Sequence, residues 1–331
     1  MDYRYLPNTG LQVSRLCLGT SNYGRGGGKE FALTNDEATE AIGYALRVGI
    51  NFFDSSESYE LGSSEEALGY ALKKLGPSRE DLVISTKVSG GAHKEKRNRS
   101  GLSRKHILNA IDESLVRLQL DYVDLYSIHR FDRNTPVEET LEALHDVVKA
   151  GKVRYLGASS MYAWQFEHML SLQERHGWSR FVAMQNQYSL NYREEEREMV
   201  PLCVARSIGM TPWGILCAGL LAGTMTRSGE RLTARAETDL LRGKAGRVAT
   251  TDQDFDIQDK VRRVAERRGA TMAEVATAWA LSKPYVVSAL IGVSRPEQID
   301  GSVTALGLQL TTEEVAFLEA DYRPVFPQTL N

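Results

Sequence analysis

The chain is poor in cysteine, nearly neutral in charge and free of long apolar runs. Its three cysteines, Cys17, Cys203 and Cys217, are too few and too scattered for a disulfide framework or a zinc site. Its 40 basic and 43 acidic residues leave a net charge of −3, which gives no reason to expect nucleic acid or an acidic membrane surface as a partner. No window approaches about 18 uninterrupted apolar residues, so no membrane insertion is expected. Since the N-terminal stretch MDYRYLPNTG is also too polar for a signal peptide, we expect a cytoplasmic protein.

Apolar strand-like runs and amphipathic helical stretches alternate eight times along the chain. Such an unbroken alternation indicates an α/β fold with a parallel sheet, because hairpin-linked antiparallel strands leave no room for the helices. An open doubly wound sheet would usually carry a nucleotide fingerprint after its first strand, which is missing, so a (β/α)8 TIM barrel is favoured. Residues 1–331 are therefore expected to form one barrel domain. The predicted strands span 15–20, 50–56, 82–88, 122–128, 153–159, 181–187, 210–215 and 286–293, and a hairpin of residues 2–6 and 11–15 precedes them.

Local signals mark several helix ends, and two connections are unusually long. Thr34 precedes an apolar stripe that stops at Gly49, Ser103 opens a second stripe, and Pro136 fits the first turn of a third. The connections 88–103 and 222–253 follow the carboxyl ends of strands, where barrel active sites are built. We expect them to cover substrate or cofactor; surface insertions without a function are the alternative.

Two features that look like binding motifs do not satisfy the motifs' spacing. The stretch 24–29 is rich in glycine, but Lys29 stands where a dinucleotide fingerprint needs glycine, and Tyr23 and Glu30 break a Walker loop. The six histidines form no pair at metal-ligand spacing, so no metal is expected.

Four polar side chains follow three consecutive predicted strands and can converge at one point of a barrel mouth. They are Asp54, Tyr59, Lys87 and His129. An ammonium beside a phenol stabilises the phenolate and makes the phenol a better acid, and a carboxylate would keep that buried lysine charged. A histidine could donate to a carbonyl oxygen or relay a proton. The set therefore suits a general acid aimed at an oxygen that gains charge, as in carbonyl reduction by hydride.

Six segments, in this order, resemble the aldo-keto reductases over nearly the whole chain, from Leu11 to about Leu318. They are GINFFDSSESYELGSSEEALGYAL, LVISTKV, LDYVDLYSIH, VKAGKVRYLGASS, MQNQYSL and IGVSRPEQI. The branch resembled is that of aryl-alcohol dehydrogenase-like reductases and potassium-channel β subunits. The resemblance implies a barrel that binds NADP(H), with Tyr59 of the four-residue set as the proton donor.

The resemblance also implies where the cofactor lies. Ser159 and Gln185 match residues that bind the nicotinamide carboxamide, Trp213 matches the aromatic that stacks on the ring, and Thr20 matches a residue near the ribose. An arginine at the adenosine end favours NADP, because a guanidinium binds the 2′-phosphate in bidentate fashion. The remaining implied cofactor residues are Gly214, Leu216, Arg235, Gly292, Ser294, Arg295 and Gln298.

Several positions depart from the family pattern. Gly214 replaces a serine and Thr224 a lysine, for which Arg235 could substitute, while Gly301 and Ser302 replace residues near the adenine. Lost hydrogen bonds would weaken cofactor binding by about 1–3 kcal/mol.

The predicted substrate pocket is lined by Tyr23, Arg130, Phe131 and the 88–103 connection. Arg130 could meet a substrate hydroxyl, carboxylate or phosphate, which favours a sugar-like or oxygen-rich carbonyl compound; the alternative is that it pairs with Asp132 or another local acid. Two other functions stay open: an NADP-binding regulatory subunit with little turnover, and a Schiff-base isomerase or aldolase that uses Lys87. The sequence leaves the oligomeric state open, including a homo-oligomer.

Overall fold

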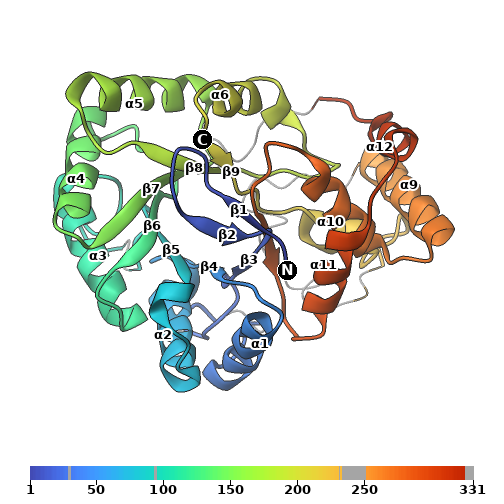
Figure 1. The fold of residues 1–331 in the computed structure, drawn as a ribbon, viewed down its shortest axis with the longest axis horizontal. Helices are drawn as coiled ribbons and strands as arrows, with labels where there is room; N and C mark the ends of the chain where they lie inside the picture. The colour runs from blue at the N-terminus through green and yellow to red at the C-terminus, as the bar shows by residue number, and fades with distance from the viewer. Residues whose placement is uncertain (29–30, 93–94, 231, 233–250, 325–331) are drawn as a thin grey trace.

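The fold comes from a computed structural model, which describes residues 1–28, 31–92, 95–230, 232 and 251–324. Eight parallel strands form one sheet in the order β10-β3-β4-β5-β6-β7-β8-β9, and a parallel bridge between Met210 and Val286 joins its two edges. This arrangement confirms the predicted barrel (Figure 1). The strands are β3 (Leu16–Gly19), β4 (Phe52–Asp54), β5 (Val83–Val88), β6 (Val123–Ile128), β7 (Val153–Ser159), β8 (Phe181–Gln185), β9 (Gly209–Met210) and β10 (Ala289–Gly292).

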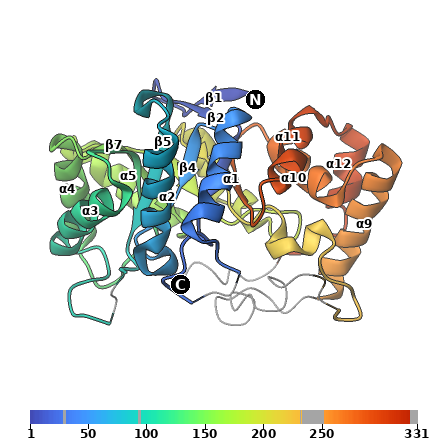
Figure 2. The ribbon, with the colours of Figure 1, turned by 90° about the horizontal axis from the view of Figure 1, so that it is seen from below.

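The predicted N-terminal hairpin closes the amino end of the barrel. Strands β1 (Tyr3–Tyr5) and β2 (Gln12–Ser14) pair antiparallel and lie at one end of the barrel in the side view (Figure 2). Leu6 and Val13 pack with Cys17, Phe52 and other inward-facing strand residues in a cluster that is buried. Arg15, which directly follows β2, donates hydrogen bonds from its guanidinium to the carbonyls of Leu281, Val286 and Val287. The hairpin therefore leaves the carboxyl ends of the strands as the open end for a site.

Helices surround the barrel, and their ends follow the sequence signals. Thr34 caps α1 through the backbone N–H of Glu37, and Ser103 caps α3 through that of His106. Pro136 lies one position before the first residue of α4 rather than inside its first turn. The helices are α1 (Asn35–Arg47), α2 (Ser63–Leu75), α3 (Arg104–Leu118), α4 (Val137–Lys149), α5 (Ala163–His176), α6 (Met199–Ala205), α9 (Asp252–Arg268), α10 (Met272–Ser282), α11 (Gln298–Gly307) and α12 (Thr312–Glu319), with 3-10 turns η1 (Tyr59–Gly62), η2 (Arg79–Asp81), η3 (Glu194–Glu196) and η4 (Cys217–Ala222).

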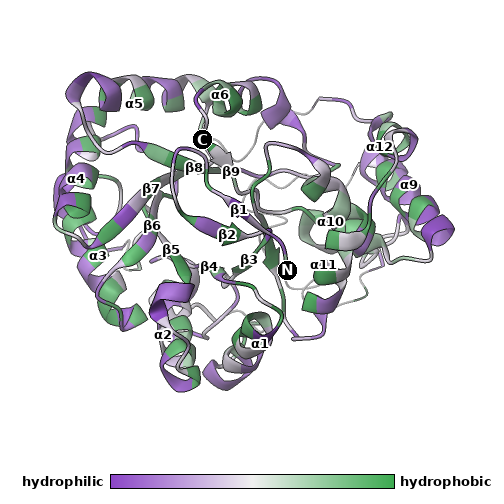
Figure 3. Cartoon of the chain, viewed as in Figure 1, coloured by the Kyte–Doolittle hydropathy of each residue, from purple (hydrophilic) through white to green (hydrophobic). Residues whose placement is uncertain are grey.

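Hydrophobic residues lie along the strands and on the sides of the helices that face them (Figure 3). This pattern is the reason why the alternation was readable in the sequence. Several strands are shorter than predicted, β9 most of all. The run 210–215 supplies only the end of β9, because Pro212 has no N–H to continue the ladder. Backbone bonds from Thr211 to Met184 and from Trp213 to Asn186 still hold the segment beside β8.

Candidate active site

The four predicted catalytic residues meet at the carboxyl ends of three neighbouring strands. Asp54 ends β4, Lys87 is the second-last residue of β5, His129 directly follows β6, and Tyr59 begins the turn η1 after β4. Parallel strands place these ends at one rim of the barrel, and the polar atoms of the four side chains approach one another there.

Lys87 is the centre of this group. Its ammonium donates to the carboxylate of Asp54, to the carbonyl of Ser55 at 2.8 Å and to the hydroxyl of Tyr59 at 3.2 Å. Both Lys87 and Asp54 are fully buried. Burial alone would lower the pKa of Lys87, but the Asp54 carboxylate and the Tyr59 hydroxyl raise it overall. The lysine is therefore an ammonium ion pointed at the phenol.

His129 is held as a neutral ring beside Tyr59. Burial, with the charges of Arg130 and Lys87, lowers the pKa of His129 well below its usual range. The two rings meet edge to face with centroids 5.4 Å apart. Nδ1 of His129 lies 3.1 Å from the hydroxyl oxygen of Ser56 and 3.5 Å from that of Ser58. The sequence analysis did not predict this role of Ser56, although Ser56 lies only two residues after Asp54, at the same strand end.

The nicotinamide-side residues named from the resemblance connect directly to this group. Gln185 ends β8, and its side-chain amide donates to Asp54 at 3.1 Å. Ser159 ends β7 and donates its hydroxyl to the backbone carbonyl of Gln185 at 2.6 Å. Thr20 is also fully buried, with its hydroxyl on the carbonyl of Asp54 at 3.1 Å and on Ser64 at 2.7 Å. The residues from β7, β8 and the loop after β3 therefore converge on Asp54.

A second hydrogen-bond network, which the sequence analysis did not predict, holds the indole of Trp213. The indole N–H donates to the hydroxyl of Ser160 at 3.3 Å, and the backbone N–H of Ser160 donates to the side chain of Asn186 at 2.7 Å. Asn186 in turn donates to the carboxylate of Glu195, which is almost completely buried. Burial, with a smaller effect of Glu194, raises the pKa of Glu195 to about 7. No local motif signals this network, because its members lie on separate loops.

Glu57 anchors the start of the 88–103 connection. Its carboxylate accepts backbone N–H groups from Ser89 at 2.8 Å and Gly91 at 2.9 Å, and it lies 3.2 Å from Nε2 of His106. Glu57 is buried, and it follows Ser56 in the loop that carries Tyr59. The connection is thereby tied to the loop that carries Tyr59. The larger part of the other long connection, 222–253, lies outside the described residues, as does Arg235.

The predicted adenosine-side residues form a compact turn between β10 and α11. The side-chain oxygen of Gln298 accepts the backbone N–H of Ser294 at 2.7 Å and that of Arg295 at 3.2 Å. Arg295 is exposed, and no carboxylate of the described residues lies within ion-pair distance of it. Gly292 precedes the turn and is exposed. After β9, Gly214 has a φ of 75°, a backbone conformation that favours glycine, and Leu216 is partly buried.

The predicted substrate-side residues lie in the loops after β3 and β6. Tyr23 is fully buried, and its hydroxyl has no hydrogen-bond partner among the described residues. Phe131 packs against Trp164 with ring centroids 6.5 Å apart. Arg130 does not pair with Asp132: that carboxylate instead binds Leu102 N–H at 2.8 Å, together with groups of residues 134 and 135. The expected alternative of an Arg130–Asp132 pair is therefore wrong, and no other carboxylate of the described residues forms an ion pair with Arg130.

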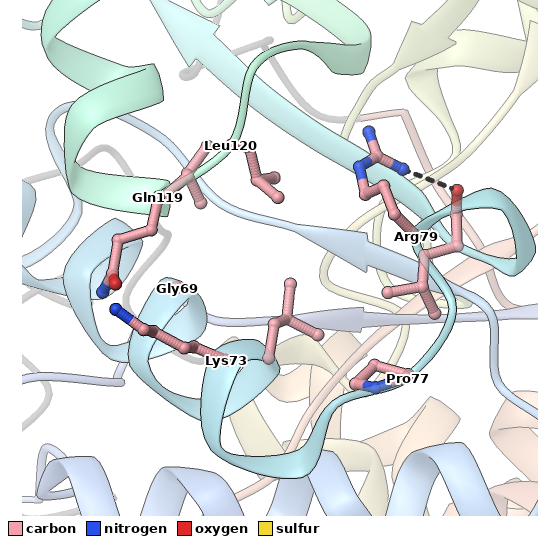
Figure 4. A pocket seen from close by; sticks show the side chains of 9 residues that line it. Gly69, Lys73, Pro77, Arg79, Gln119 and Leu120 are labelled. Carbon is pink, nitrogen blue, oxygen red and sulfur yellow. Dashed lines mark hydrogen bonds between the residues drawn. The ribbon is translucent and has the colours of Figure 1, made fainter.

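A surface pocket of about 280 Å³ lies elsewhere, between the carboxyl ends of α2 and α3 (Figure 4). It includes Leu82, which precedes β5, so it opens near the amino ends of the strands, opposite the catalytic group. Arg79, at its edge, is already paired with Asp124.

In the described part of the chain no helix is long and apolar enough to span a membrane, and no three metal-binding side chains cluster.

Comparisons with known proteins identify the family of the chain. A sequence model of the aldo/keto reductase family matches residues 15–322. The chain is 39% identical over 340 residues to the versiconal hemiacetal acetate reductase of Aspergillus parasiticus, with 98% of each chain covered. It is 38% identical over 348 residues to the aldo-keto reductase AMT2 of Alternaria alternata, with 98% of this chain and 93% of the relative covered. A protein of Schizosaccharomyces pombe, provisionally named as an aryl-alcohol dehydrogenase, is 37% identical over 353 residues, with 98% and 96% covered.

The fold and these relatives define a barrel oxidoreductase that acts on carbonyl or alcohol groups. The chain belongs to the aldo/keto reductase family, in its aryl-alcohol dehydrogenase-like branch. The resemblance recognised in the sequence is therefore confirmed.

Proposed function

We propose that the protein is an NADPH-dependent carbonyl reductase, with Tyr59 as the proton donor to the oxygen of an aldehyde or ketone. The observation that carries the proposal is the contact of 3.2 Å between the Lys87 ammonium and the Tyr59 hydroxyl. A cation at that distance stabilises the phenolate that forms when Tyr59 gives up its proton. Asp54 keeps the ammonium charged and in place.

His129 supports the same proton transfer. Ser56 accepts the backbone N–H of Ser58 at 3.3 Å, and two acceptors lie within reach of its own hydroxyl hydrogen: Nδ1 of His129 at 3.1 Å and the hydroxyl oxygen of Ser58 at 3.1 Å. In the proposed mechanism this hydrogen is donated to Nδ1. A neutral ring that accepts at Nδ1 carries its proton on Nε2. That N–H is then available to donate to the carbonyl oxygen while Tyr59 protonates it.

The residues present fit NADP(H). Ser159 and Gln185 offer polar groups at neighbouring strand ends, and the partly buried indole of Trp213 offers a face for a planar ring. Arg295 offers an exposed guanidinium without a carboxylate partner among the described residues, suited to a 2′-phosphate. When bound, NADPH supplies the hydride. The side chain of Gln185 would orient the cofactor's carboxamide relative to Asp54, which it already contacts.

We propose a small oxygen-rich carbonyl compound as the substrate. Arg130 supplies a charged group next to His129 and Phe131 supplies an apolar wall, with Tyr23 as a further expected lining residue. The three cysteines are free thiols, which supports a reducing compartment such as the cytoplasm. A single barrel domain over residues 1–331 completes the proposal.

The test is NADPH oxidation across a panel of aromatic, aliphatic and sugar aldehydes, with NADH as the matched cofactor control. Turnover with NADPH on at least one class is the expected result. If NADPH binds tightly and no aldehyde is reduced, the proposal fails and an NADP-binding regulatory role takes its place.

A Schiff-base role for Lys87 has little support. An amine must lose its proton to attack a carbonyl, and the buried ion pair with Asp54 stabilises the protonated form. Borohydride trapping of an aldehyde on the protein should therefore leave Lys87 unmodified.

A further inference from the structure

Arg130 lies next to His129 and has no acidic partner among the described residues. One Nη1–H of its guanidinium donates to the carbonyl of His129 at 2.6 Å. An arginine has five N–H donors, and this contact is the one hydrogen bond of the side chain to the described residues. None of their carboxylates lies within 4.0 Å of it. Burial lowers the pKa of Arg130, while the nearby Tyr59 partly offsets that effect.

The charges around Arg130 do not neutralise it. Lys87 and Asp54 form a buried pair and cancel each other, and His129 is neutral. Asp132, the nearest acid in the sequence, is occupied by the bonds that fix its own loop. A partly buried guanidinium without an acidic partner among the described residues is costly unless a ligand supplies the counter-charge.

Arg130 lies in a different loop from most of the predicted cofactor residues, on the side where we expect the substrate. The predicted cofactor residues lie mainly on β7 to β10 and their loops, whereas Arg130 follows β6, between His129 and Phe131. Phe131 packs against Trp164, whose side chain is 64% exposed, so an apolar surface lies next to the charge.

We infer that Arg130 binds an oxyanion, a carboxylate or a phosphate, carried by the carbonyl substrate. The inference rests on the proposed reductase function and narrows its substrate class to acidic aldehydes or ketones. A guanidinium can bind either group through two parallel N–H bonds. The substrate would then be fixed at two points, its acidic group on Arg130 and its carbonyl oxygen on Tyr59 and His129.

The experiment compares matched pairs of aldehydes that differ in charge. The carboxylate arm uses 4-carboxybenzaldehyde against its methyl ester, and the phosphate arm uses glyceraldehyde 3-phosphate against glyceraldehyde. In the wild type, kcat/KM should favour the charged member of at least one pair by roughly 10- to 100-fold, as expected for a hydrogen-bonded ion pair. The arm with the larger preference identifies the oxyanion.

The variants Arg130→Met and Arg130→Lys then test the residue. Arg130→Met should abolish the preference, and Arg130→Lys should keep part of it, because an ammonium retains the charge without the two-bond geometry. Arg133→Met is the matched control: Arg133 lies three residues further along the same loop and is exposed, so its loss should leave the preference unchanged. NADPH affinity, measured by fluorescence titration, should be the same in Arg130→Met as in the wild type.

Three results would overturn the inference. The first is equal turnover of charged and neutral partners in the wild type, which needs no variant to observe and leaves the reductase function standing. The second is a preference that survives in Arg130→Met. The third is weakened NADPH binding in Arg130→Met, which would assign Arg130 to the cofactor. Failure of the wild type to reduce any aldehyde, charged or neutral, would instead overturn the proposed function and this inference with it.

Discussion

The hydroxyl oxygen of Ser56 lies 3.1 Å from Nδ1 of His129. Ser56 is buried, and it belongs to the same loop as Tyr59, so one short segment carries the proposed proton donor and orients its neighbouring ring. A hydroxyl that donates to Nδ1 fixes the tautomer with the proton on Nε2. In the proposed mechanism Ser56 is a positioning residue that acts through His129.

Replacing Ser56 by alanine should therefore slow carbonyl reduction without unfolding the protein. We expect kcat/KM to fall about fivefold, the equivalent of one hydrogen bond of about 1 kcal/mol, with little change in the NADPH dissociation constant. The measurement is steady-state kinetics with a good aldehyde substrate. Ser58→Ala is the matched control and should have a smaller effect, since its oxygen lies 3.5 Å from the ring nitrogen. Equal losses in both variants would argue against the tautomer role.

The buried pair of Lys87 and Asp54 should show strong coupling in stability. Lys87→Met leaves a fully buried carboxylate without its cation, and we expect a loss of about 3–5 kcal/mol in the free energy of unfolding. Asp54→Asn leaves the ammonium unpaired and should cost a similar amount. The double variant should lose much less than the sum, and urea unfolding measures all four proteins. Additive losses would contradict the coupling.

Glu195 should make stability depend on pH near neutrality. The pKa of Glu195 is about 7 in the folded protein against 4.5 when exposed, so the folded state binds more protons between these values. Its contribution to the free energy of unfolding is therefore present below about pH 4.5 and is lost as the pH rises through 7, by about 3 kcal/mol in total. Glu195→Gln removes this titration.

The check is urea unfolding of the wild type and Glu195→Gln from pH 5 to 8. The stability of the wild type relative to this variant should decrease as the pH rises. Glu198→Gln changes an exposed carboxylate in the same segment and should give a constant difference. A constant difference for Glu195→Gln as well would mean that its carboxylate titrates normally.

Arg295 should make the protein bind NADPH more tightly than NADH. If its guanidinium binds the 2′-phosphate, Arg295→Ala weakens NADPH binding by roughly 10-fold or more, the value of a hydrogen-bonded ion pair. NADH lacks that phosphate, so its affinity in the same variant serves as the control and should not change. Fluorescence titration measures both. Parallel losses for the two nucleotides would show that the turn around Gln298, and not the phosphate contact, was disturbed.

The sequence was sufficient to predict the barrel and the rim at which Asp54, Lys87 and Tyr59 meet. Hydrophobic runs and helix caps such as Thr34 and Ser103 are local signals, and parallel strands bring the polar residues after them to one rim. The convergence of Asp54, Lys87 and Tyr59 follows from that geometry.

What the sequence could not supply were contacts between loops. The chain from Trp213 through Ser160 and Asn186 to Glu195 joins segments whose relative placement depends on the folded barrel. The same holds for Asp132: adjacency suggested a partner for Arg130, but the carboxylate turns to the backbone of Leu102 instead. The length of a strand could also be overestimated. The apolar run 210–215 continues past Pro212, but strand β9 ends at Met210.

The most direct test of the proposed mechanism is NADPH oxidation by Tyr59→Phe, together with its NADPH affinity. The variant keeps the ring beside Lys87 and His129 and removes the Tyr59 hydroxyl that the ammonium contacts. We expect kcat/KM for aldehyde reduction to fall by about 10²- to 10⁴-fold while the NADPH dissociation constant stays close to that of the wild type. Turnover within a few-fold of the wild type would contradict it, because another group would then be donating the proton.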